Sequence, residues 1–170
     1  MLRAKILHLK DKQFFEMSNG VMRFIGKPTD VAKKLKEEDY DMIHIVDVDA
    51  LHGLKTNYDV YNHLTFTINI EVECGDREDL LTNLLTVKSR VIINLPTKLD
   101  LKKFKEKKLL VGKITATFDG DPSAVNDLII ENATDAVVIK FSKTNRILVY
   151  KSDFDKLSEK AKKKIFCVIS

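Results

Sequence analysis

Acidic residues close to the ends of apolar segments are the first candidates for chemistry in this chain. They are Asp47, Asp49, Glu71, Glu73 and Asp119. Divalent cations take oxygen ligands, so one hypothesis is that these carboxylates form a metal site. The other is that they pair with lysines inside the fold, because a buried charge needs a partner. The lysines placed for such pairs are Lys5, Lys113 and Lys140. We expect ion pairing, with no metal and no cofactor.

Histidine and cysteine offer fewer options. Cys74 could act as a nucleophile, but a small buried side chain beneath a helix is the favoured interpretation. In the segment DMIHIVDVD, His44 alternates with Asp47, so we expect it on the opposite face, packed under a helix. His52 and Gly53 follow in a loop that could touch a ligand.

The charge pattern says more about which partners to exclude. The formal net charge is +4, and lysines cluster at 102–108 and 160–164. A phosphate-backbone footprint is one interpretation, but no aromatic residues interleave with these lysines, so we favour solvated helix faces and no nucleic acid. A modest positive field still favours a phosphorylated small molecule. No run approaches about 18 apolar residues, so no membrane partner is expected. The charged N-terminus and two cysteines favour the cytoplasm.

Apolar runs and helical patterns alternate along the whole chain and indicate a single domain over residues 1–170. Strands are predicted at 3–9, 41–49, 67–74, 89–95, 109–118, 135–141 (with 146–151 as its extension) and 165–170. Helices are predicted from Thr29, over 57–64, from Asp76, over 100–108, over 122–133 and from Asp153. Asn19-Gly20 predicts a hairpin turn. Strands separated by helices are typical of a parallel sheet.

Polar residues on one face of these strands help to choose between the two parallel architectures. A doubly wound sheet is covered on both faces, and its strands read as continuous apolar runs. Here Glu71 and Glu73 alternate with Ile70 and Val72. That pattern favours a TIM-like (β/α) barrel whose mouth is lined by functional side chains. The sequence predicts about seven strands, and so an incomplete barrel.

Several segments resemble the HisA/HisF family of (β/α)8 barrels from histidine biosynthesis. AKILHLKDKQFFEM is similar to the family's opening strand and hairpin, with its Ile-Asp-Leu-Lys-Asp-Gly pattern. PTDVAKKLKEEDYDMIHIVDVDALHG matches the block that contains Leu-His-x-Val-Asp-Leu-Asp-Gly-Ala. INIEVECGDRED stands where the family has its third strand and a Gly-Gly-Gly-Ile-Arg turn. The resemblance is strong over residues 1–80 and thinner beyond.

The resemblance implies an aldose–ketose (Amadori) isomerisation of a phosphoribosyl imidazole carboxamide, performed by two proton-transfer groups. In this chain those positions are His8, where the family has Asp, and Asp119. The implied substrate-binding residues are Asp47, Asp49, Gly75, Arg77 and Gly120. The family's phosphate-binding glycines are mostly replaced. Glu73 and Asp76 stand in their place, and these carboxylates would oppose a phosphate.

Three functional hypotheses follow. The first is a divergent isomerase of a phosphorylated small molecule. The second is a non-catalytic protein that binds a small molecule or assembles with a partner. The third is a carboxylate-lined metal site. The 170 residues are short for a (β/α)8 barrel, which typically needs about 200–250. We therefore expect a squeezed seven-stranded barrel, or a neighbouring copy in a homodimer that covers open barrel edges.

Overall fold

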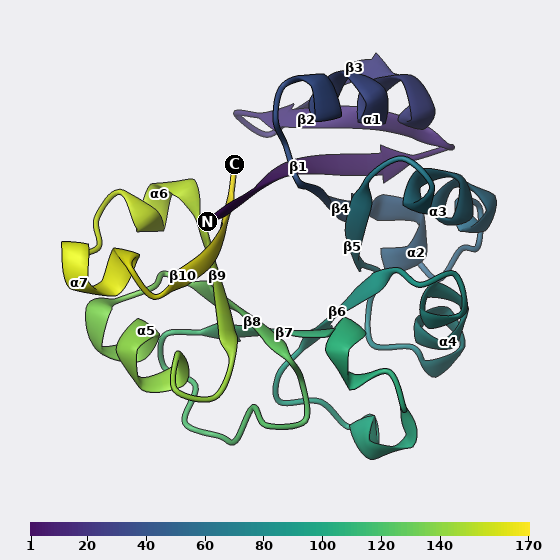
Figure 1. The fold of residues 1–170 in the computed structure, drawn as a ribbon. Helices are drawn as coiled ribbons and strands as arrows, with labels where there is room; N and C mark the ends of the chain where they lie inside the picture. Colours follow the sequence, from purple (N-terminus) through teal and green to yellow (C-terminus); the bar gives the residue numbers. More distant parts are fainter.

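Eight parallel strands form a closed barrel in the computed structural model, which describes residues 1–170 (Figure 1). The strands are β1 (Leu2–Lys10), β4 (Met42–Asp47), β5 (Asn69–Glu73), β6 (Arg90–Asn94), β7 (Leu110–Thr115), β8 (Asp127–Glu131), β9 (Arg146–Tyr150) and β10 (Ile165–Ile169). Leu2 lies opposite Cys167 and Ala4 opposite Ile169, so the first and last strands pair and close the ring. The predicted TIM-like barrel is confirmed.

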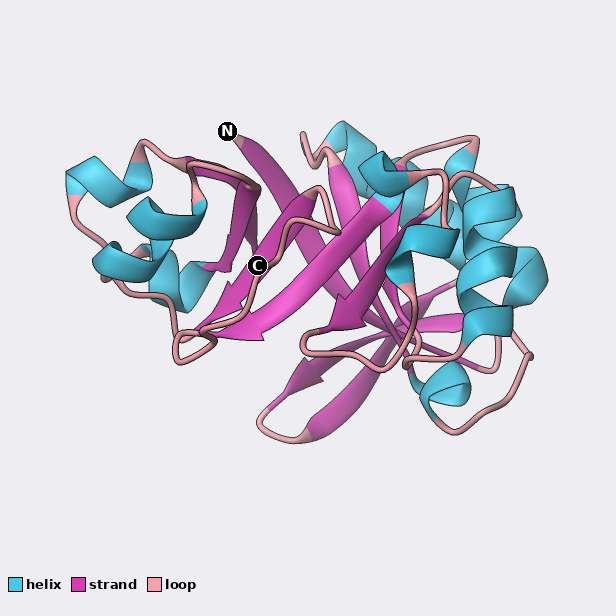
Figure 2. Cartoon of the chain, turned by 90° about the horizontal axis from the view of Figure 1, so that it is seen from below, coloured by secondary structure: helices cyan, strands magenta, loops and turns pink.

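Helices surround the barrel on its outside (Figures 1 and 2). They are α1 (Pro28–Glu37), α2 (Val48–Leu51), α3 (Tyr58–Thr65), α4 (Glu78–Thr86), α5 (Asp135–Phe141), α6 (Lys151–Phe154) and α7 (Glu159–Lys162), with 3₁₀ turns at Leu101–Lys103 and Lys107–Leu109. An antiparallel hairpin of β2 (Gln13–Ser18) and β3 (Val21–Gly26) extends from the end of β1. Its turn is at Asn19 and Gly20, both with positive φ, as predicted. No helix in the structure has the length and apolar character needed to cross a membrane.

The prediction of about seven strands and open barrel edges is wrong. The helix predicted over 122–133 contains strand β8, and the strand predicted over 135–141 is helix α5. Both segments are short apolar runs, which fit a strand or a buried helix turn equally well by periodicity. Eight units fit into 170 residues because several strands have only five residues and three helices only four.

The helix predicted over 100–108 is reduced to two separate 3₁₀ turns. Leu101 is the only buried residue in these turns. A short helix depends on packing of an apolar face, and this lysine-rich segment does not have a continuous one.

Two apolar clusters divide the core. The larger lies between the strands and the helices and includes Leu7, Ile45 and Val72. The smaller contains only strand residues, such as Ala4, Met42 and Ile129, and fills the inside of the barrel. Because side chains alternate along a strand, these clusters identify which residues face the interior.

Candidate active site at the mouth of the barrel

Polar side chains lie in two layers at the carboxyl-terminal end of the barrel interior. Strand register places His8 level with Val46 and Glu73. One step deeper, Ile6 is level with His44 and Glu71. Enzymes with this fold carry their active sites at the carboxyl ends of the strands. These layers are therefore the candidate active site.

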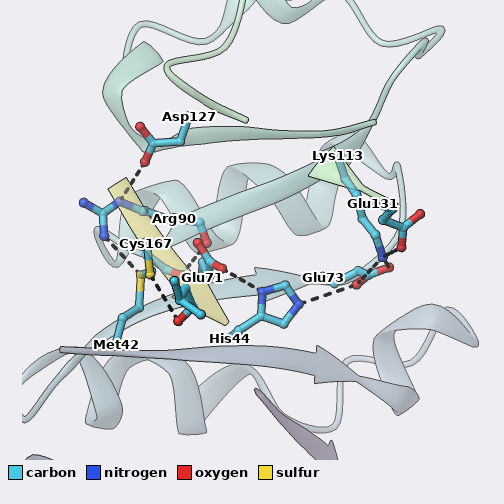
Figure 3. A network of polar contacts seen from close by, with 11 residues as sticks. Met42, His44, Glu71, Glu73, Arg90, Lys113, Asp127, Glu131 and Cys167 are labelled. Carbon is cyan, nitrogen blue, oxygen red and sulfur yellow. Dashed lines mark hydrogen bonds and ion pairs between the residues drawn. The ribbon is translucent and has the colours of Figure 1, made fainter. Parts of the chain in front are cut away.

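Lys113 is the centre of an ion-pair group at this mouth (Figure 3). Its Nζ lies 3.2 Å from Oε1 of Glu73 and 3.1 Å from Oε1 of Glu131. Burial alone would lower the pKa of Lys113, but Tyr150, Glu73 and Glu131 more than offset it, and the pKa lies above its usual value. The ammonium therefore stays charged and does not serve as a base or a nucleophile. The predicted pairing of Lys113 with an interior carboxylate is confirmed.

His44 and Glu71 form a fully buried pair beneath the mouth (Figure 3). Nδ1 of His44 lies 2.6 Å from Oε1 of Glu71, and neither side chain is exposed. Nε2 of His44 lies 3.9 Å from Oε2 of Glu73. The prediction that His44 packs beneath a helix is wrong. Ile45 faces the helices, so its neighbour His44 must face the interior.

His8 is half-buried in the mouth, on the interior face of β1. Its Nδ1 is buried without a hydrogen-bond partner. Burial lowers the pKa of the imidazole, His44 lowers it further, and Glu73 partly opposes them. The ring is therefore neutral at neutral pH, and a neutral imidazole can accept a proton.

Asp119 lies apart from His8, in the exposed loop that follows β7. The two side chains share no hydrogen bond, and the carboxylate of Asp119 is not among the charges that shift the pKa of His8. Strand β7 ends at Thr115, earlier than the predicted end at 118. Gly120, predicted to bind substrate, follows in the same loop and packs against the Phe118 ring.

Asp47 is buried on the helix side of the sheet and makes only internal hydrogen bonds. Its Oδ1 accepts from the backbone N–H of Ala50 and from Nδ2 of Asn57, both at 2.9 Å. Its Oδ2 accepts a short hydrogen bond from the hydroxyl of Tyr61. Burial raises the pKa of Asp47, although these hydrogen bonds oppose the shift.

Asp49 extends the same network to the start of the hairpin. Its Oδ2 accepts from the backbone N–H of Asp11 at 2.8 Å and from Nδ2 of Asn57 at 3.0 Å. Asn57 also accepts from the backbone N–H of Lys12. The pair Asp47 and Asp49 thus fixes α2 against the β1–β2 turn. This placement lends no support to their predicted role in binding substrate.

Gly75 and Arg77 lie in the turn between β5 and α4. Gly75 has a φ of 84°, which favours glycine. The Nη1 of Arg77 donates to the carbonyl of Gly53 at 2.9 Å, and its Nη2 contacts Asp79 at 3.1 Å. This exposed guanidinium therefore links the loop after β4 to the turn before α4. A role of Gly53, Gly75 or Arg77 in ligand binding stays a prediction.

The carboxylate cluster of the metal-site hypothesis does not form. Asp47 and Asp49 lie on the helix side, Glu71 and Glu73 inside the barrel, and Asp119 in a loop. No group of three or more histidine, cysteine or acidic side chains is arranged to hold a metal ion.

Cys74 packs in the apolar core between the strands and the helices, fully buried as expected. Burial raises its pKa to about 12, so the thiol stays protonated at neutral pH. A protonated, inaccessible thiol does not act as a nucleophile.

Sequence reasoning missed Glu131 and Tyr150 as parts of the mouth. Glu131 was hidden because its strand was predicted as a helix. Asp127, Ile129 and Glu131 share one face if the segment is a strand, and Leu128 and Ile130 share the other. The two acidic residues on one face of an apolar run are the signal that could have revealed the strand.

Comparisons with known proteins identify the family. Residues 6–141 match the model of the family described as "Histidine biosynthesis protein". An imidazole-4-carboxamide isomerase of Methanocaldococcus jannaschii is 32% identical over 79 residues, which are 44% of this chain and 33% of that protein. The corresponding isomerase of Nitrosopumilus maritimus is 31% identical over 86 residues, 49% of this chain and 34% of that protein. The matched segment thus spans about a third of each relative. This chain belongs to the histidine biosynthesis protein family, the HisA/HisF family that its sequence resembles.

Proposed function

We propose that the protein is an intramolecular isomerase that converts a phosphorylated aminoaldose to the aminoketose, with His8 as a proton-transfer group. The observation that carries the proposal is the imidazole of His8, half-buried on the interior face of β1 at the mouth of the barrel. It stands where the family's opening strand has its proton-transferring Asp. The two relatives are named as isomerases of a bis-phosphoribosyl imidazole-4-carboxamide.

The chemistry requires a base and an acid. An Amadori rearrangement opens the sugar ring by protonating the ring oxygen, then removes a proton from carbon. The unprotonated ring of His8 is suited to accept the carbon-bound proton. Asp119 is the proposed acid, supplied by the loop after β7. Asp119 lies apart from His8 in this structure, in the exposed loop.

Substrate binding is proposed for the exposed groups around the mouth. Arg77 offers a guanidinium, and the turns at Gly75 and Gly120 offer backbone N–H groups to a phosphate. Asp47 and Asp49 would act indirectly, by holding the loop after β4.

The test is turnover of the substrate named for the relatives, together with rescue of a strain that lacks this isomerase. His8→Ala is expected to lose about 10²–10⁴-fold in kcat, as is typical for removal of a proton-transfer group. His8→Asp, which restores the family's residue, should retain part of the activity. His63→Ala is the matched control, because His63 is exposed on α3. No turnover and no rescue by the wild-type protein would remove the proposal.

A non-catalytic binding protein is the second candidate. It is favoured by the ion pairs at the mouth, where Glu73, Lys113 and Glu131 satisfy one another. Binding of a sugar phosphate by calorimetry without any turnover would assign this role. The homodimer was expected because a partner would cover open barrel edges, and there are none, since β1 and β10 close the barrel within one chain. It stays a prediction, as does the cytoplasmic location.

A further inference from the structure

We propose that His44 is a positioning residue, a buried imidazolium that keeps His8 in its neutral, proton-accepting form. The part of this inference that concerns catalysis rests on the proposed function. The electrostatic effect of His44 on His8 does not depend on it. Nothing in the reaction itself requires a second histidine below the first.

The two rings are neighbours inside the barrel. Strands β1 and β4 are paired, with Ile6 opposite His44 and His8 opposite Val46. His8 therefore lies on the interior face, one layer above His44 on the adjacent strand. Nδ1 of His8 and Nε2 of His44 are both buried without a hydrogen-bond partner. These two nitrogens are shielded from solvent, and such shielding strengthens the effect of a charge on one ring upon the other.

The interior charges favour a proton on His44. Four carboxylates face the interior of the barrel, from Glu71, Glu73, Asp127 and Glu131. Three permanent cations accompany them, from Arg90, Lys113 and Arg146. Arg146 contacts both carboxylate oxygens of Asp127, at 2.6 and 2.8 Å. Lys113 forms ion pairs with both Glu73 and Glu131. An imidazolium at His44 is the cation that balances the set.

The local geometry of His44 suits that charge. Nδ1–H donates to the fully buried carboxylate of Glu71 at 2.6 Å, which holds the ring in place. A proton on Nε2 would face the carboxylate of Glu73 at 3.9 Å. Removing the proton would leave Glu71 as a buried carboxylate without a cationic partner, which is costly. The other titratable side chains around this pair are Tyr150, whose ring centroid lies 6.1 Å from that of His44, and the thiol of Cys167.

A positive charge on His44 then disfavours a second positive charge on His8. The lowered pKa of His8 agrees with this, with burial as the first cause and His44 as the second. Glu73 acts in the opposite direction. The layer below the mouth thus sets the protonation state of the residue in the mouth.

The test is an NMR titration of the four histidines in the full chain. The signal of His8 is identified by its loss in His8→Gln. In His44→Gln, and in Glu71→Gln, we expect His8 to titrate at higher pH than in the wild type, because the charge below it is lost. His52→Gln is the matched control, since this exposed histidine bonds to the carbonyl of Val48 outside the barrel. It should leave the titration of His8 unchanged.

Two results would overturn the inference. One is an unchanged titration of His8 in folded His44→Gln or Glu71→Gln. The other needs no variant: imidazole ¹⁵N shifts of the wild type at pH 7 that show His44 neutral. If the isomerase assay fails but the titration moves as expected, the proposed function fails and the coupling of the histidines stands. If turnover is found but the titration does not move, only the coupling fails.

Discussion

Asp47 belongs to the segment that most resembles the family, and its removal separates a structural role from a substrate-binding one. Asp47→Ala removes the acceptor of three hydrogen bonds, from the N–H of Ala50, from one N–H of the Asn57 amide and from the hydroxyl of Tyr61. An unsatisfied buried donor costs about 1–3 kcal/mol, so we expect a loss of about 3–5 kcal/mol in the free energy of unfolding. That is a large part of the 5–15 kcal/mol typical of a domain.

Urea denaturation followed by circular dichroism measures this loss. Asp47→Asn is the matched variant, because its amide oxygen still accepts from Ala50 and Asn57 and its NH₂ can donate to the Tyr61 oxygen. It also removes a carboxylate whose pKa burial raises. We expect it to cost about 1 kcal/mol or less. The reasoning would be refuted if Asp47→Ala lost less than about 1 kcal/mol while abolishing turnover, since Asp47 would then act on substrate.

Further perturbations probe other parts of the barrel. In Gly112→Ala, the new Cβ would lie 2.7 Å from Cδ1 of Leu95, so overpacking should cost about 1–3 kcal/mol in urea denaturation; an unchanged midpoint would show that the neighbours yield freely. Because burial raises the pKa of Cys167, like that of Cys74, to about 12, neither thiol should react with Ellman's reagent in the native protein, and both should in urea. Folding lowers the pKa of His8, so protonation of this ring favours the unfolded chain. The resulting loss of folding stability is complete below the folded pKa and vanishes above the usual value of 6.5. His8→Gln should therefore gain stability relative to the wild type at pH 5 and not at pH 8, and an equal difference at both would contradict the assignment.

The barrel could be predicted from the sequence because its signals repeat. Polar residues recur on one face of several strands, as Glu71 and Glu73 do, and a single element predicted incorrectly leaves the pattern intact. The number of strands could not be predicted in the same way. It depended on two adjacent apolar runs, at 127–131 and 135–141, whose lengths fit a strand or a helix. Only pairing with β7 and β9 decides which run is the strand.

The candidate site was predicted in part for a similar reason. His8 was placed by resemblance, and the structure sets it in the mouth. The face of Asp47 and His44 was assigned from the assumption that aspartates line the mouth, whereas the apolar neighbour Ile45 determines which face packs on helices. Asp47 can be buried there because Asn57 and Tyr61, 10 and 14 residues further along the chain, donate hydrogen bonds to its carboxylate. The residues next to Asp47 in the sequence do not predict these donors.

Register connects two departures from the family that are distant in sequence. The chain has His8 where the family has Asp, and Glu73 where it has the first glycine of a phosphate-binding turn. The structure places both side chains in one layer, on either side of Val46. In this layer the carboxylate comes from β5 and not from β1, and Lys113 pairs with it.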